Sequence, residues 1–169
     1  YARVVGLFSR SVVIMFGLPI GHISILLLIP VLGAVLLVFV PRRQIRMLFT
    51  LATLASGLDF LWSVKIFALF DGASGEMQLV ERAPWMPGFG IQYLVGIDGI
   101  SLFLVLLTTL LMPVSILASW SVKERVREYL IFMLLLETGM LGAFVALDLF
   151  LFYVFWEVML VPMYFLIGV

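Results

Sequence analysis

The chain has 169 residues, of which 64% are hydrophobic and 12% charged, and its ten basic and ten acidic residues cancel. Soluble domains average about 45–50% apolar and about 25% charged residues, so this composition indicates an all-α integral membrane protein. Zero net charge leaves no basic face for nucleic acid, and a chain with no cysteine and His22 as its one histidine has no ligand set for an iron–sulfur cluster, haem or zinc.

Residues 1–14 are expected to be a poorly defined N-terminal extension. Arg3 and Arg10 interrupt this segment, and Met15 is the expected natural start. The apolar run that follows is too long for a secretory signal peptide and has no small-residue cleavage site.

The first membrane-spanning helix is predicted within residues 15–40. Its uninterrupted apolar part begins at His22 and ends before Arg42 and Arg43, whose charges stop it at the membrane surface. Pro30 predicts a kink, which neighbouring helices can accommodate. His22 is interpreted as an interfacial residue.

The second span is predicted over residues 47–70 and contains two charged residues, Asp59 and Lys65. They are six positions apart, so they do not share a helical face as residues at i and i+4 do. Lys65 can extend toward the nearer membrane surface. For Asp59, a role in an ion pathway and a purely structural role both stay open.

Residues 71–94 are rich in glycine and proline and are predicted to form an extramembrane loop. The third span follows over residues 95–120. Asp98 stands at its entrance, where a carboxylate suits the N-cap of a helix. The GIDG sequence around Asp98 is interpreted as a turn with no flanking strand, which excludes a nucleotide-binding loop. Pro113 predicts a kink in this span.

The fourth span is predicted over residues 129–147, with Glu137 near its middle. Gly139 and Gly142 are interpreted as small residues that let two helices approach closely.

The fifth span is predicted over residues 148–169 and places Glu157 inside an otherwise apolar run. An acid at such depth costs at least ~2.5 kcal/mol, so it usually faces a partner or a water-filled path. Pro162 leaves the carbonyl of Val158 without its donor and introduces a kink. Tyr153 and Tyr164 lie one and two helical turns from Glu157, where their hydroxyls can reach its carboxyl or a water.

Two segments carry a family resemblance. FYVFWEVMLVPMYFLIGV at the C-terminus and YLVGIDGISLFLVLLTTLLMP before it, together with ALDLFLFY, closely resemble the antiporter-like subunit M (chain 4 type) of the proton-pumping NADH–quinone oxidoreductase, complex I. The resemblance is firm from Ile91 onward and looser in the first two spans. It covers the N-terminal portion of such a subunit only.

The resemblance implies a fold of roughly fourteen helices with two inverted five-helix repeats, the first repeat starting at the fourth span. It implies that Glu157 is the proton-pathway acid, paired with a lysine on a later broken helix that these residues do not include. NADH, FMN, iron–sulfur clusters and quinone are expected on partner subunits. The partners implied are other membrane subunits of complex I, the lipid bilayer and protons.

The basic residues predict the orientation. The turns after the first and third spans carry most of the lysine and arginine, so both face the cytoplasm or matrix and the N-terminus lies outside. Arg3 and Arg10 do not fit this assignment, because they would lie on the outer side, whereas positive residues favour the cytoplasm or matrix. The match looks more bacterial than mitochondrial, which favours a multi-pass protein of the bacterial inner membrane.

The candidate site residues are thus two intramembrane carboxyls, Glu137 and Glu157, on consecutive antiparallel helices, with no catalytic residue, bound cofactor or metal on this chain. The function predicted is proton translocation driven by electron transfer in partner subunits. Two alternatives stay open: a subunit of a cation/proton antiporter or membrane-bound hydrogenase with the same fold, and a structural membrane subunit that moves no ions.

Overall fold

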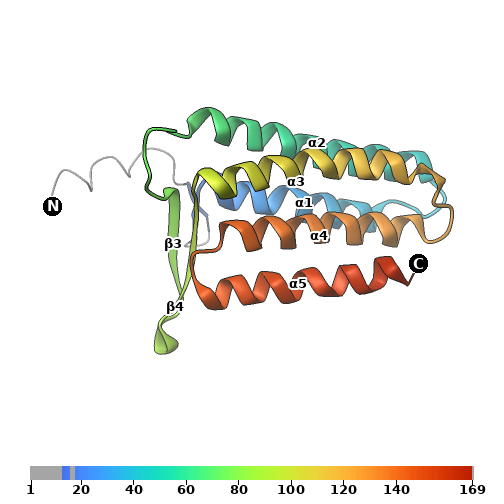
Figure 1. Ribbon diagram of the computed structural model, residues 1–169. Coiled ribbons are helices and arrows are strands. Elements are labelled where there is room, and N and C mark those ends of the chain that lie inside the picture. The colour runs from blue at the N-terminus through green and yellow to red at the C-terminus, as the bar shows by residue number, and fades with distance from the viewer. Residues whose placement is uncertain (1–12, 16–17, 169) are drawn as a thin grey trace, which may run out of the picture.

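The computed structural model describes residues 13–15 and 18–168. Five antiparallel helices lie side by side (Figure 1), and each is long and apolar enough to cross a membrane. The prediction of an all-α membrane architecture with five spanning helices is therefore confirmed. The helices are α1 (His22–Phe39), α2 (Ile45–Leu69), α3 (Gly99–Ala118), α4 (Val126–Val145) and α5 (Leu149–Ile167).

A β-hairpin covers one end of the bundle (Figure 1), in the region that the sequence predicted to be a loop. Its strands are β3 (Gln78–Met86) and β4 (Ile91–Ile97), joined by a 3-10 turn at Pro87–Phe89. Gly90 closes this turn with φ +71°, a conformation that favours glycine. Because β4 runs to Ile97, the third helix begins at Gly99 rather than at residue 95.

Two further predictions differ from the structure near helix starts. A strand, β4, does precede the GIDG turn, but it pairs antiparallel with β3 and belongs to no βαβ unit. In the first predicted span, α1 begins only at His22, because Leu18–Ile20 forms strand β2 and pairs with β1 (Val13–Met15). The predicted N-terminal extension comprises residues 1–14, and residues 1–12 of it lie outside the described part of the chain.

Asp98 caps α3 as predicted. Its Oδ1 accepts a hydrogen bond from the backbone nitrogen of Ser101 at 2.7 Å, and the Ser101 hydroxyl oxygen in turn accepts a hydrogen bond from the backbone nitrogen of Asp98 at 2.9 Å. This reciprocal arrangement is a capping box. Asp148 caps α5 in the simpler way, through the backbone nitrogens of Phe150 and Leu151.

The helices pack around α1 and α4. Helix α1 contacts α2 and α4, α3 contacts α2 and α4, and α5 packs mainly on α4. Glycines make the α4–α5 contact close: a Cβ on Gly142 would lie 2.2 Å from the ring of Phe155, and one on Gly139 would lie 3.0 Å from the Cβ of Met159. The predicted role of these two glycines is therefore confirmed.

The two basic turns lie at the same end of the bundle, opposite the β3–β4 hairpin (Figure 1). Arg42, which follows α1, forms an ion pair with Glu128 near the start of α4. The cations that gather at this end include Lys123, Arg125 and Arg127. This clustering fits the predicted orientation, with this end toward the cytoplasm or matrix.

Candidate intramembrane carboxyl site

The buried core consists of two apolar clusters, one toward each end of the bundle. On α2, for example, Ala52 belongs to the cluster near the basic turns and Ile66 to the cluster near the hairpin. The buried polar side chains of the membrane-spanning helices lie mostly between these clusters. We call this set the mid-bundle polar layer; its members are Ser56, Asp59, Ser63, Thr109, Glu137 and Thr138.

Asp59 and Glu137 are the two acids of the mid-bundle polar layer, and both side chains are fully buried, with 0% exposure. Ala55 of α2 and Leu134 of α4 both lie against Gly33 of α1. Asp59 and Glu137 follow these two residues by about one helical turn in helices that run in the same direction (Figure 1), so the two acids lie at the same level of the bundle. Neither oxygen of either carboxyl has a hydrogen-bond partner within the described residues. The structure thus brings Glu137 together with Asp59, whose role the sequence had left open.

Hydroxyl groups surround this acid pair. Ser56, Asp59 and Ser63 follow one another at helical spacing on the inward face of α2, and all three are fully buried. The Ser63 hydroxyl is 2.8 Å from the hydroxyl of Thr109 on α3. Pro113 lies four positions after Thr109, and the Thr109 carbonyl therefore lacks its usual helical donor.

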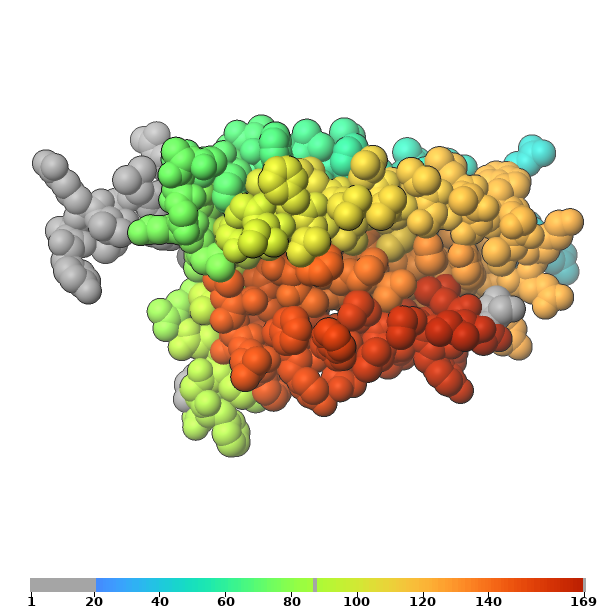
Figure 2. All heavy atoms as spheres, viewed as in Figure 1, coloured from blue at the N-terminus to red at the C-terminus, as the bar shows by residue number. Residues whose placement is uncertain are grey.

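Glu157 lies on a different surface. Phe155 and Met159 face the glycines of α4, and Glu157 is about 200° around the helix from each of them, since successive residues are about 100° apart. Its side chain is accordingly exposed, on the face of α5 that points away from α4. Figure 2 shows α5 uncovered along its length in this view. The structure therefore does not bring Glu137 and Glu157 together.

Of the two tyrosines predicted to flank Glu157, Tyr153 lies one helical turn before it on the same exposed side of α5. Tyr164 is 75% exposed and packs edge-on against Phe165. Asp59 and Lys65 point in different directions, as predicted: Asp59 is buried, whereas Lys65 is exposed with its Nζ 4.0 Å from the ring centroid of Trp62.

The remaining predicted features lie at the ends of the bundle. The carbonyl of His22 accepts a hydrogen bond from the Trp62 indole nitrogen at 2.9 Å, at the end near the hairpin.

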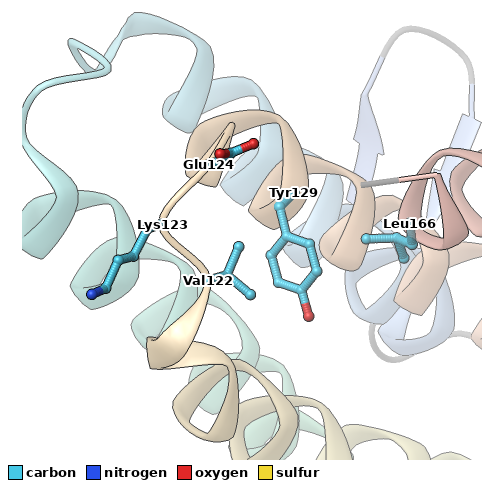
Figure 3. A pocket seen from close by; sticks show the side chains of 5 residues that line it. All are labelled: Val122, Lys123, Glu124, Tyr129 and Leu166. Carbon is cyan, nitrogen blue, oxygen red and sulfur yellow. The ribbon is translucent and has the colours of Figure 1, made fainter.

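At the opposite end, a cavity of about 370 Å³ lies between the α3–α4 turn, Tyr129 and Leu166 (Figure 3). None of the intramembrane acids lines it. Among the described residues, no group of three His, Cys, Asp or Glu side chains is arranged to hold a metal.

Known proteins resemble the chain over most of its length. Residues 23–146 match the family model described as NADH-ubiquinone oxidoreductase chain 4, amino terminus. NADH-ubiquinone oxidoreductase chain 4 of Arabidopsis thaliana is 44% identical over 149 residues, which cover 88% of this chain and 30% of that protein. NADH-quinone oxidoreductase subunit M of Rhodobacter capsulatus is 43% identical over 151 residues, covering 87% and 29%.

A solved structure agrees with these relatives. One chain of the respiratory complex I from Thermus thermophilus with bound NADH superposes with a TM-score of 0.69 and 32% sequence identity, covering 83% of this chain and 27% of that one. The chain spans about 30% of the length of the curated relatives that it matches. Plant and bacterial relatives are similarly identical, so the similarity does not favour a bacterial over a mitochondrial origin. The chain belongs to the family of NADH-ubiquinone oxidoreductase chain 4, in the part that corresponds to the amino terminus of that subunit.

Proposed function

We propose that this chain forms part of a proton-translocating membrane subunit of a respiratory NADH–quinone oxidoreductase, with Glu157 and Glu137 as proton-pathway acids. The observation that carries the proposal is the position of Glu157, a carboxyl within the membrane-spanning part of α5 on a face that α4 leaves open. Such an acid is costly in hydrocarbon and usually serves an ion path. NADH, FMN, iron–sulfur clusters and quinone would be bound by partner subunits.

The open face of α5 gives Glu157 room for a cationic partner. The family resemblance supports a lysine from a later helix in this role, and Tyr153 lies one helical turn before the acid on the same exposed side of α5, where its hydroxyl can reach the carboxyl. A cation that approaches Glu157 favours its charged form, and withdrawal of that cation favours the neutral form. Movement of a neighbouring charge would thus make Glu157 release and take up a proton, without redox chemistry on this chain.

Glu137 would be the second proton-pathway acid, on the buried side of α4. The α4–α5 contacts place Glu157 at the height of α4 between Gly139 and Gly142, which is about one helical turn from Glu137. The two acids therefore lie at similar depth on different sides of the same helix pair. This geometry supports two connected stations and not a single carboxylate dyad. The membrane would be the bacterial inner membrane or the mitochondrial inner membrane.

The test is Glu157→Gln in the assembled complex, with NADH-driven proton uptake measured per NADH oxidised. Neutral glutamine keeps the size of the side chain but holds no transferable proton, so pumping should fall while the complex still assembles. Val161→Ala is the matched control, because Val161 lies one turn further on the same exposed side of α5 and is apolar. Normal pumping by an assembled Glu157→Gln complex would instead support a structural subunit. Sodium-dependent exchange without NADH would support an antiporter.

A further inference from the structure

Asp59 has no part in the proposed function, yet its surroundings are unusual for an acid. Its side chain is fully buried in the mid-bundle polar layer, in the middle of α2, with apolar clusters on both sides along the bundle axis. Neither carboxyl oxygen has a hydrogen-bond partner in the described residues. A buried polar group in this condition needs an explanation beyond packing.

Glu137, on α4, is likewise a buried carboxyl without a hydrogen-bond partner among the described residues. Its side chain is fully buried, and it lies at the level of Asp59, because both acids follow by about one helical turn the residues of α2 and α4 that lie against Gly33. Two buried carboxyls from neighbouring helices thus lie at one level inside the bundle. An apolar pair of similar size would pack there without any desolvation cost, so the acids serve a purpose other than stability.

No cation within the described helices compensates the pair. Helix α3 has no charged residue, and the one titratable residue of α1, His22, stands at its far end. On α2 itself, Arg46 is exposed at the start of the helix and Lys65 is turned outward over Trp62. Arg127 and Glu128 of α4 lie at the basic end, and Glu157 of α5 faces away from α4.

Two adjacent carboxylates without a cation repel each other strongly in a low-dielectric interior, whereas one proton between them removes the repulsion and makes each group a partner of the other. We propose that Asp59 and Glu137 form a proton-binding site in the middle of the bundle, in which the two carboxyls share one proton. The site extends toward α3 through the Ser63–Thr109 hydroxyl pair, which lies about one turn from Asp59.

The chemistry is a simple exchange. The protonated carboxyl of one acid donates its O–H to the carboxylate of the other, and the site passes between singly and doubly protonated states by gaining or losing one proton. The use of this proton in translocation rests on the proposed function, whereas its presence between Asp59 and Glu137 is independent of that function.

The first experiment is a mutant cycle in the assembled complex, with Asp59→Asn, Glu137→Gln and the double variant. Groups that act as a unit give non-additive losses. We expect each single variant and the double variant to show the same loss in protons pumped per NADH oxidised. Multiplying losses, unequal single losses or normal pumping by Asp59→Asn would overturn the use of a shared proton in translocation, and the carbonyl band of the second experiment decides whether the proton is shared. Ser56→Ala is the matched control, because the Ser56 hydroxyl is buried on the same helix face but bonds only to its own backbone.

The second experiment detects the proton itself, by infrared difference spectroscopy of the complex in H₂O and D₂O. We expect one deuterium-sensitive carbonyl band of a protonated carboxyl in the wild type, and its displacement or loss in both Asp59→Asn and Glu137→Gln, because each variant removes one of the two groups that share the proton. A wild-type band that persists unchanged in either variant would contradict the proposal. If Asp59→Asn fails to assemble, Asp59→Glu replaces it. The longer side chain changes the distance between the two carboxyls, so the carbonyl band should shift. An unchanged band in Asp59→Glu would contradict the shared proton.

The two proposals fail separately. If Glu157→Gln loses pumping while Asp59→Asn pumps normally and keeps the carbonyl band unchanged, the proposed function stands. The proposal of a shared proton is then wrong. Normal pumping in Glu157→Gln removes the proposed function, and the carbonyl band then still decides whether Asp59 and Glu137 share a proton.

Discussion

The carboxylate of Glu81 on β3 holds the first turn of α1 through Ser24. Glu81 Oε2 accepts a hydrogen bond from the Ser24 backbone nitrogen at 3.1 Å and another from the Ser24 hydroxyl, while Oε1 accepts from the Ile23 nitrogen at 2.7 Å. Glu81 is only 5% exposed. A buried carboxylate 57 positions away in sequence thus caps a membrane-spanning helix.

Gly21 makes this cap possible. It occupies the N-cap position of α1 and offers no side-chain acceptor of its own. A Cβ at Gly21 would lie 2.3 Å from Glu81 Oε1, so any larger residue would displace the carboxylate. The Ser24 hydroxyl also lies 2.7 Å from the Tyr93 hydroxyl on β4, which ties both strands of the hairpin to the helix.

Glu81→Gln should loosen the start of α1. The amide nitrogen would face backbone N–H groups that need acceptors, and loss of a charged hydrogen bond of this kind costs about 1.5–3 kcal/mol. Hydrogen exchange of the Ile23 and Ser24 amides should therefore accelerate by at least about tenfold. Glu76→Gln, an exposed change in the same extramembrane segment, is the control. Unchanged exchange at Ser24 would show that the cap contributes nothing to stability.

Gly142→Ala should disturb the α4–α5 contact, because its Cβ would lie 2.2 Å from the ring of Phe155. Overpacking of this kind typically costs about 1–3 kcal/mol. The expected result is a lower yield of assembled complex and a lower thermal midpoint, both partly restored by adding Phe155→Ala. Gly57→Ala, at a helical glycine with open space around it, should have no such effect. Equal behaviour of the two alanine variants would argue against a tight α4–α5 contact.

Asp98 should make the start of α3 sensitive to acid. The hydrogen bonds from the Ser101 backbone and side chain hold the pKa of Asp98 below its ordinary value. A carboxylate with a lowered pKa stabilises the folded state above its unfolded-state pKa of about 3.9, and this stabilisation disappears as the pH falls through the folded-state value. Protection of the Ser101 amide, measured relative to Asp98→Asn, should decline over that acidic range. A pH-independent difference would mean that the charge of Asp98 is not what caps α3.

Single cysteines can test the orientation, since the chain has none of its own. Gly75→Cys and Lys123→Cys both lie at exposed positions, near the hairpin and on the basic turn respectively. A thiol reagent that does not cross membranes should label only Gly75→Cys from outside and only Lys123→Cys from the cytoplasmic or matrix side. The reverse pattern, or labelling of both from one side, would contradict the orientation.

Local features of the sequence predicted the architecture well. Apolar runs of sufficient length indicated five spanning helices, which the structure confirms. Asp98 at a helix entrance and Gly139 and Gly142 within a span were likewise interpreted correctly. Capping and close helix approach depend on residue type and on a few neighbours in the chain. Such properties can be recognised without knowledge of the tertiary fold.

Relationships between distant residues were not predictable in the same way. The hairpin of residues 78–97 was expected to be a loop because its glycines and prolines are also turn signals. The Glu81 cap joins residues with no shared sequence pattern. That Asp59 and not Glu157 lies inside the bundle with Glu137 depends on how α2, α4 and α5 are rotated about their axes.

That rotation is the decisive quantity for the candidate site. The sequence by itself determined that acids lie at membrane depth, because the surrounding residues are apolar on every side. The same uniform apolarity hides which side of each helix faces inward. Only the packed structure decided it. The glycines of α4 contact Phe155 and Met159, which turns Glu157 outward, whereas Asp59 lies on the inward face of α2 at the level of Glu137.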